Sequence, residues 1–321
     1  MNLQTKIPLI QQQHNQIDYH SKLLLIGSCF VENMGEKLDY FKFQTLQNPF
    51  GILFHPKTIE SLVTNTIHKI VYKEEDVFFL NEQWHCFDAH SKLSHPNKGV
   101  LLNNLNSQVN LTREYLETTS HVIITLGTAW VYRCLETDAV VANCHKIPQK
   151  NFLKELLSVD EILQSLEAIA HLIKSANPLA TLIFTVSPIR HLKDGFIENT
   201  LSKAHLITAI HKLLNQKPSS TNRQSHYFPS YELMMDELRD YRFYAEDMIH
   251  PNQTAIHYIW EKFNMVWISE KTLHIMEEVD AIQKGLQHKL FHPNSEAHNV
   301  FLQKLSVRKE KLQLDFPHIY F

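Results

Sequence analysis

Glycine is scarce in this sequence: 7 of its 321 residues are glycine. Because glycine is used mainly where the backbone needs unusual dihedral angles or a close approach, each one present indicates such a place. The three that bear on function are Gly27, Gly51 and Gly127. They form neither a G-x-G-x-x-G nor a G-x-x-x-x-G-K-[ST] pattern, so the loops that cradle the phosphates of bound nucleotides are missing. We therefore expect no nucleotide cofactor, and no other cofactor is predicted.

Cysteine is also rare, and its 4 residues lie far apart, at Cys29, Cys86, Cys134 and Cys144. No Cys-x-x-Cys spacing occurs, which argues against a zinc knuckle and against a disulfide framework. We expect free thiols in a reducing compartment.

Long charged or apolar runs are missing as well. No basic run occurs, and 31 basic against 34 acidic residues leave a formal net charge of −3, so a nucleic-acid partner is not indicated. No apolar run approaches the length needed to cross a membrane, and residues 1–20 lack the pattern of a signal peptide. We predict a cytoplasmic protein with no membrane partner.

What the sequence does contain is an alternation of strand-like and helix-like segments. Apolar runs of strand length lie at residues 23–26, 122–126 and 181–186, and each ends at a glycine or at Ser-Pro, as a buried parallel strand entering a loop does. Helical periodicity lies between them, over residues 30–38, 56–70, 101–116, 159–176 and 201–214. This alternation predicts an α/β fold with a doubly wound parallel sheet.

Two segments interrupt the alternation and one follows it. Residues 77–94 and 129–148 are rich in aromatic and β-branched side chains, which predicts β-hairpin insertions. Residues 269–314 predict two helices, the second capped by Asn294 or Ser295. Since no repeat or linker separates the parts, we predict one domain over residues 1–265, with a C-terminal helical extension over residues 266–321 packed on it.

The first chemically interesting feature is the corner Gly27-Ser28-Cys29, where the first apolar run ends and a helix begins. Ser28 suits the N-cap of that helix, and Cys29 would then lie in its first turn. There the helix dipole and unpaired N–H groups would favour the thiolate and lower the pKa of Cys29, which makes it a candidate nucleophile. Two alternatives stay open: Cys29 is only a small buried residue of a turn, or Ser28 is the nucleophile.

The segment Asp247-Met248-Ile249-His250-Pro251 offers a partner for that nucleophile. Pro251 suits the first position of a helix, so Asp247 and His250 would lie just before it. A nucleophile needs a base, and the base needs an orienting carboxylate, which this pair can supply. Two other interpretations remain open: Asp247 caps the helix, or His250 binds a metal with Asp247 or another histidine, although no H-x-x-x-H or H-E-x-x-H spacing accompanies it.

Together these motifs resemble the GSCFA family, a branch of the SGNH (GDSL-like) hydrolase superfamily. The resemblance rests on Gly27-Ser28-Cys29-Phe30 and on Asp247-x-x-His250-Pro251, and it covers about residues 23–263. Further matching stretches are residues 48–56, 125–133, 143–148, 185–191 and 228–251.

This resemblance implies a flavodoxin-like three-layer sandwich that hydrolyses or transfers acyl esters through a Cys(or Ser)-His-Asp arrangement. The serine nucleophile of the superfamily aligns with Cys29, and Ser28 takes the place of the aspartate before it. The Asp-x-x-His block falls on Asp247 and His250. A glycine whose N–H binds the oxyanion falls on Gly51, and the N–H of Cys29 would assist it.

The sequence departs from the superfamily at Gly127-Thr128-Ala129, where the asparagine that completes the oxyanion hole is missing. One such donor contributes about 3 kcal/mol to transition-state stabilisation, so its loss matters. Thr128, Asn48 or Asn143 could substitute for it.

Further residues are candidates for substrate binding. His145 and Arg190 follow predicted strands, where ligands of α/β sheets bind, and Trp130 offers a pocket wall. An anionic substrate would need an arginine, and other candidates are Arg133, Arg239 and Arg242, although salt bridges are their ordinary role.

Two functional hypotheses follow from these motifs. The first is a hydrolase or acyltransferase acting on a small-molecule or saccharide ester. The second is a carbohydrate-binding or scaffold protein that keeps the fold but has lost catalysis, as the missing asparagine and the aromatic hairpins around Trp84 and Trp130 suggest.

Overall fold

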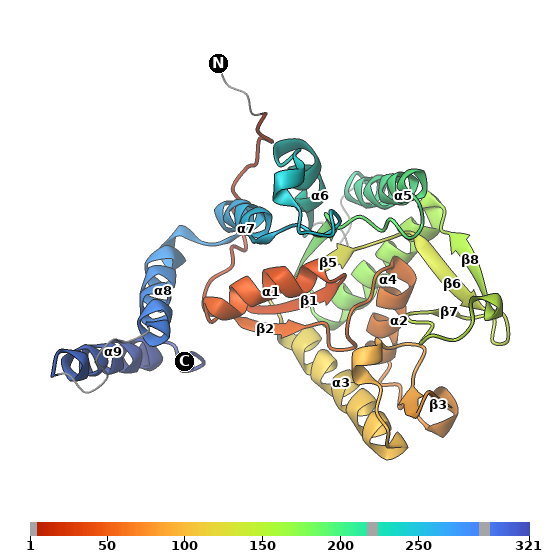
Figure 1. The fold of residues 1–321 in the computed structure, drawn as a ribbon, viewed down its shortest axis with the longest axis horizontal. Coiled ribbons are helices and arrows are strands. Elements are labelled where there is room, and N and C mark those ends of the chain that lie inside the picture. Colours follow the sequence, from red (N-terminus) through yellow and green to blue (C-terminus); the bar gives the residue numbers. More distant parts are fainter. Residues whose placement is uncertain (1–4, 217–223, 289–295) are drawn as a thin grey trace.

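A parallel sheet forms the centre of the protein. The computed structural model describes residues 5–216, 224–288 and 296–321. The sheet has five strands in the order β10-β9-β5-β1-β2 (Figure 1). Their bounds are β1 (Lys22–Gly27), β2 (Gln44–Gln47), β5 (His121–Leu126), β9 (Thr181–Val186) and β10 (Ser225–Tyr227), and every pairing is parallel. This is the flavodoxin-like order, so the predicted α/β fold is confirmed.

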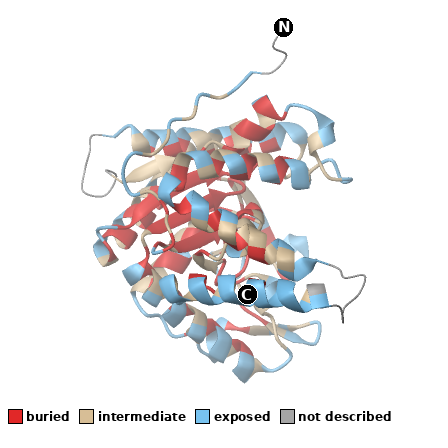
Figure 2. Ribbon diagram, turned by 90° about the vertical axis from the view of Figure 1, so that its left-hand side faces the viewer, coloured by how far each residue is buried: buried red, intermediate tan, exposed pale blue. Residues whose placement is uncertain are grey.

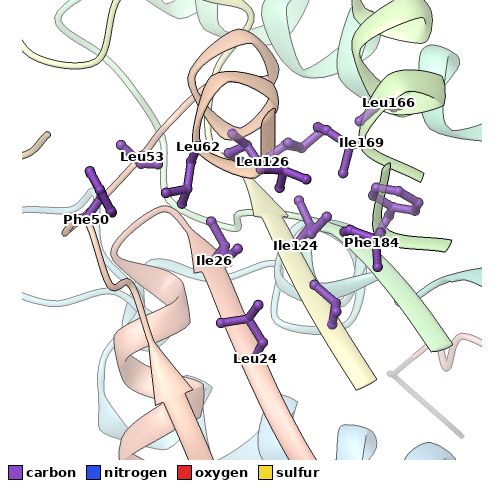
Figure 3. Packing of buried hydrophobic residues seen from close by; sticks show 14 of the residues in the cluster. Leu24, Ile26, Phe50, Leu53, Leu62, Ile124, Leu126, Leu166, Ile169 and Phe184 are labelled. Carbon is purple, nitrogen blue, oxygen red and sulfur yellow. The ribbon is translucent and has the colours of Figure 1, made fainter. Parts of the chain in front are cut away.

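Helices cover both faces of the sheet because its central strands are apolar on both sides. One layer holds α2 (Pro56–Ile67), α3 (Lys98–Thr118), α4 (Val159–Ala176) and α5 (Phe196–Leu214), and the other holds α1 (Phe30–Tyr40) and α7 (Gln253–Trp267). Figure 3 shows Leu24 and Ile26 of β1 among side chains of the first layer, such as Leu62 and Leu166. The alternate residues Leu23 and Leu25 pack in the second layer.

Burial of these side chains stabilises the sandwich. Figure 2 shows the buried residues concentrated on the sheet and on the inner faces of the helices. Leu24 and Ile26 are fully buried, and each such side chain contributes roughly 1.5–3 kcal/mol relative to exposure. The rigid sheet therefore fixes the positions of the loops that leave its strands.

Small antiparallel sheets form the two insertions. The first is the hairpin of β3 (Phe78–Leu80) and β4 (Gln83–His85), as predicted. The second pairs β6 (Trp130–Cys134) with β7 (Val140–Val141), but β8 (Phe152–Leu156) adds a third strand that the sequence pattern did not predict. This second sheet lies on the side of the molecule opposite α8 and α9 (Figure 1).

The C-terminal part forms the two predicted helices, α8 (Leu273–Gln287) and α9 (Glu296–Asp315), which extend from one side of the sandwich (Figure 1). Asn294 and Ser295 lie outside the described residues, and the division into domains at residue 265 stays a prediction. The short segment α6 (Ser230–Glu232) leads into a π-helical turn (Leu233–Glu237). Single 3-10 turns lie at Glu74–Asp76, Ser91–Leu93, Gln149–Asn151, Tyr241–Phe243 and Glu270–Thr272. Among the described residues, no helix is at once long and apolar enough to cross a membrane.

Candidate active site

The carboxyl ends of β1, β5 and β9 meet at one edge of the sheet, and the strand order reverses between β1 and β5. Such a switch point is where open α/β sheets bind ligands. Gly27 ends β1 with φ +144°, and a Cβ atom there would lie 2.1 Å from the carbonyl oxygen of Thr125. A Cβ atom on Gly127 would lie 3.2 Å from His191 Nε2 and 3.3 Å from Ser28 Cβ. Both glycines therefore allow the loops of this edge to approach closely.

Ser28 does not cap helix α1, so that prediction is wrong. The helix begins at Phe30 with Cys29 at the N-cap position, and the Ser28 hydroxyl is buried with no hydrogen-bond partner. The backbone explains this: the Ser28 N–H donates to the Thr125 carbonyl at 3.0 Å, and the side chain lies against Gly127. Ser28 is therefore directed at the loop after β5 rather than at the first turn of the helix.

The Cys29 thiol is partly exposed at the same edge. Its pKa is raised, because burial outweighs the backbone N–H groups of Cys29 and Phe30, which favour the thiolate. The charge of Glu32 raises this pKa further, and that of Lys203 lowers it. The sequence predicted a lowered pKa for Cys29. That prediction is wrong, because partial burial destabilises the thiolate more than the N–H groups at the helix N-terminus stabilise it.

Lys203 is a charged group of the site that sequence reasoning missed. It projects from α5, is 1% exposed, and its Nζ donates to the carbonyl oxygens of Gly127 at 2.7 Å and Ser187 at 2.8 Å. Burial lowers the pKa of Lys203 to about 7. Lys203 lies on the same helix face as the buried Leu206 and Ile210. Its place on an apolar face was the feature of the sequence that could have indicated a buried lysine.

The pH dependence of alkylation tests this description of Cys29. We expect iodoacetamide to modify Cys29 slowly at neutral pH and progressively faster as the pH rises past 9, because only the thiolate reacts. In Lys203→Met the profile above pH 9 should stay nearly unchanged, since burial lowers the pKa of Lys203 to about 7 and its amine is neutral there. Peptide mass spectrometry reads out modification at Cys29 alone, and rapid alkylation below pH 8 would contradict the raised pKa.

Asp247 and His250 form the predicted pair. The Asp247 carboxylate accepts hydrogen bonds from the N–H groups of Ile249 at 2.9 Å and His250 at 3.0 Å, and its second oxygen lies 2.5 Å from His250 Nδ1. The backbone N–H of His250, then that of Ile249 and then the imidazole lower the pKa of Asp247 to about 2. The carboxylate thus fixes the ring of an exposed His250 through Nδ1 and does not engage its Nε2.

The helix after this pair begins later than predicted. Helix α7 starts at Gln253, and Asn252 caps it by accepting from the N–H of Ala255 at 3.1 Å. Pro251 is therefore not its first residue, and Asp247 is not its cap. Asp247 belongs instead to a turn closed by the Ala245 N–H, which donates to the His250 carbonyl at 2.7 Å, and Pro251 follows that turn.

Arg190 and His191 link this turn to the sheet. The Arg190 guanidinium lies over the Tyr244 ring, 4.6 Å from its centroid, and donates to the Met248 carbonyl. His191 Nε2 is buried without a hydrogen-bond partner, and burial, followed by the charges of Lys203 and His250, lowers the pKa of His191 to about 3. The loop after β9 therefore lies beside the Asp247–His250 turn, and His191 is a second site residue that sequence reasoning missed.

No hydrogen bond joins Cys29 to His250 in the part of the chain that the structure describes. They share a neighbourhood: Lys203 interacts electrostatically with both Cys29 and His191, and His191 with His250. Catalytic hydrogen bonds are often long or absent until substrate binds. The edge therefore gathers a thiol, a buried cation and a carboxylate-oriented imidazole.

Comparison with known families identifies the chain. Residues 22–263, which include this whole edge, match the model of the GSCFA family. The chain belongs to the GSCFA family. Residues 279–321 match a second model, described as GSCFA domain protein, C-terminal domain. No curated protein matches the chain.

Not every predicted oxyanion donor of the GSCFA domain is free. The Gly51 N–H donates to the Asn48 carbonyl at 2.7 Å, and the Thr128 hydroxyl is occupied by Ser202 and by the N–H of Trp130. Asn48 differs: its Oδ1 accepts from the Gly27 N–H at 2.9 Å, while its buried Nδ2 has no partner. In this structure Asn48, not Gly51 or Thr128, presents an unused side-chain donor beside the corner Gly27-Ser28-Cys29.

Two further residues predicted to contact substrate, His145 and Trp130, make contacts within the GSCFA domain. His145 is 4% exposed within the aromatic cluster of the first hairpin, and its Nε2 lies 2.7 Å from the Cys86 carbonyl, so it is a core residue. Trp130 bonds to the Glu198 carbonyl through its indole N–H, and Lys154 lies over its ring. Across residues 5–216, 224–288 and 296–321, no three His, Cys, Asp or Glu side chains gather closely enough to hold a metal ion.

Proposed function

We propose that this GSCFA protein is an SGNH-like enzyme that hydrolyses or transfers acyl esters, with Cys29 as nucleophile, His250 as base and Asp247 as its orienting carboxylate. The observation that carries the proposal is the Asp247–His250 pair, held 2.5 Å apart beside the sheet edge that bears Cys29. Ser28 remains the alternative nucleophile, but its hydroxyl is fully buried, whereas the thiol is partly exposed.

The proposed reaction proceeds in two acyl transfers. His250 Nε2 takes the thiol proton of Cys29, the sulfur attacks the ester carbonyl carbon, and the carbonyl electron pair moves onto oxygen. When that adduct collapses, the ester C–O bond breaks, the leaving alkoxide takes the proton from His250, and a thioester remains on Cys29. Water or another hydroxyl then gives its proton to His250 and attacks the thioester. The C–S bond breaks, the thiol regains its proton, and an acid or a new ester leaves.

Two donors are proposed for the oxyanion of each adduct. They are the backbone N–H of Cys29 and the Nδ2 of Asn48, which is buried and without a partner. A buried amide that donates to the developing charge contributes about 3 kcal/mol, as the asparagine missing from Gly127-Thr128-Ala129 would have done. In its protonated form Lys203 adds a positive charge near the sulfur and favours the thiolate.

The substrate is proposed to be a small-molecule or saccharide ester. A thioester can be intercepted by a hydroxyl or amine before water, so transfer is compatible with the same residues. The test is a screen of short p-nitrophenyl esters with wild type, Cys29→Ala and Ser28→Ala. We expect cleavage by wild type, loss in Cys29→Ala and retention in Ser28→Ala, whereas the reverse pattern would assign the chemistry to Ser28.

A second candidate function is binding without catalysis. The raised pKa of Cys29 and the missing Cys29–His250 hydrogen bond favour it. Saturable binding of saccharides together with no cleavage of any ester by wild type would establish this alternative.

A further inference from the structure

A groove of about 380 Å³ is linked to the Asp247–His250 turn through Arg190. Its lining includes Arg190, Arg239, Tyr241 and Tyr244. Arg190 belongs to both places, because it lines the groove and donates to the carbonyl of Met248 within the turn. A ligand in the groove would therefore contact a residue that also holds His250 in place.

The two arginines of the groove have no carboxylate partner among the described residues. The guanidinium of Arg190 lies over the rings of Tyr244 and Tyr241, at 4.6 Å and 5.6 Å from their centroids, and its Nε is buried without a hydrogen-bond partner. Arg239 is exposed and makes no ion pair in the described ranges. By contrast, Arg133 is paired with Glu155 at 2.8 Å. Neither guanidinium of the groove is therefore paired with a carboxylate in the part of the chain that the structure describes.

Two acids also line the groove, and their charges must be weighed. Asp240 is paired with Arg242 at 2.9 Å, which offsets its charge. Asp236 makes no ion pair in the described part of the chain, so its negative charge offsets the positive charge of one of the two arginines. The balance is positive, and Tyr241, which is 61% exposed, adds a flat apolar surface at the rim.

We propose that this groove binds the anionic part of the substrate, a carboxylate or phosphate group on a sugar-sized molecule whose ester lies at Cys29. Guanidinium groups bind both oxyanions through paired hydrogen bonds, and tyrosine rings pack on the faces of sugar rings. Arg239 sets specificity, while Arg190 both binds the anion and positions the His250 turn. This assignment rests on the proposed function, because it names the substrate class of that site.

Calorimetric titration of the Cys29→Ala variant tests the groove, since binding needs no chemistry. The probes are glucose 6-phosphate, glucuronate and glucose. We expect the first, the second or both to bind at least about 10-fold more tightly than glucose, and the stronger of the two identifies the anion. Adding Arg239→Gln should weaken anion binding about 10- to 100-fold, the effect of losing a charged hydrogen bond, and added salt should weaken it as well.

Arg133→Gln is the matched control, because it removes an arginine that is paired on β6, outside the groove. Equal affinity for the three sugars, no binding, or anion binding that Arg239→Gln leaves unchanged would overturn the groove assignment. Failure of ester cleavage alone would overturn the proposed enzyme and leave these titrations standing, so the two failures are distinguishable.

Discussion

Replacing Cys29 or His250 with alanine is expected to lower the rate of ester cleavage by about 10³-fold or more, the loss typical of a nucleophile or its base. The physical reason is that both groups act in the same proton transfer and bond-forming step. For the same reason the double variant should be no slower than the slower single variant, since residues that act as a unit are strongly non-additive. Steady-state kinetics on p-nitrophenyl acetate would measure all three rates.

A matched control for His250 lies on helix α7. His257 is an exposed histidine 3.2 Å from the carboxylate of Glu261. Like His250 it is paired with an acid, but it lies on helix α7 and not in the Asp247–His250 turn. His257→Ala should keep the wild-type rate. Two results would contradict the proposal that Cys29 and His250 act together. One is a wild-type rate in Cys29→Ala and His250→Ala, and the other is a double variant whose rate loss equals the product of the two single losses.

Acid is expected to unfold the protein between about pH 6 and pH 4, because buried histidines must be protonated. Burial lowers the pKa values of His55, His121 and His145 to about 4 each, against an ordinary value of 6.5. The unfolded chain binds more protons than the folded one between these values, so the free energy of unfolding falls as the pH falls through this window. At pH 5 each histidine removes about 2 kcal/mol, or roughly 6 kcal/mol together.

That loss is comparable to the whole stability of an ordinary domain, about 5–15 kcal/mol. Urea unfolding at pH 7.5 and pH 5, followed by tryptophan fluorescence, would measure it. His145→Gln is the informative variant, since an amide can still donate to the Cys86 carbonyl but does not titrate in this range. In His145→Gln the difference in unfolding free energy between pH 7.5 and pH 5 should be about 2 kcal/mol smaller than in wild type. An unchanged difference would contradict the lowered pKa of His145.

The fold was predictable where the sequence is periodic and strongly apolar. The strands at residues 23–26, 122–126 and 181–186 and the helix over residues 159–176 all occur in the structure. Strands β2 and β10, with the sequences QTLQ and SHY, carry no apolar run and form because the neighbouring strands supply hydrogen-bonding edges. Their pairing is a tertiary effect that a local pattern cannot contain.

The candidate site was predictable where the motif is local. Asp247 and His250 are three residues apart, so a single turn brings them together, as expected. Lys203 reaches the site only because β5 and β9 are adjacent in the sheet, which no spacing along the chain indicates. The wrong predictions of a Ser28 cap and of a lowered pKa for Cys29 have a common origin. Both side chains are at least partly buried by loops at the strand ends, and the local sequence does not indicate that burial.

The most direct test is to find the acyl group on the enzyme. Wild-type protein would be mixed with p-nitrophenyl acetate, quenched in acid, and analysed by intact and peptide mass spectrometry with Cys29→Ala in parallel. We predict one acetyl group on Cys29 that neutral hydroxylamine removes, as it removes thioesters, and no such group in Cys29→Ala. An acetyl group on Ser28, or no acetyl group on either residue while the ester is cleaved, would contradict the assignment of Cys29 as nucleophile.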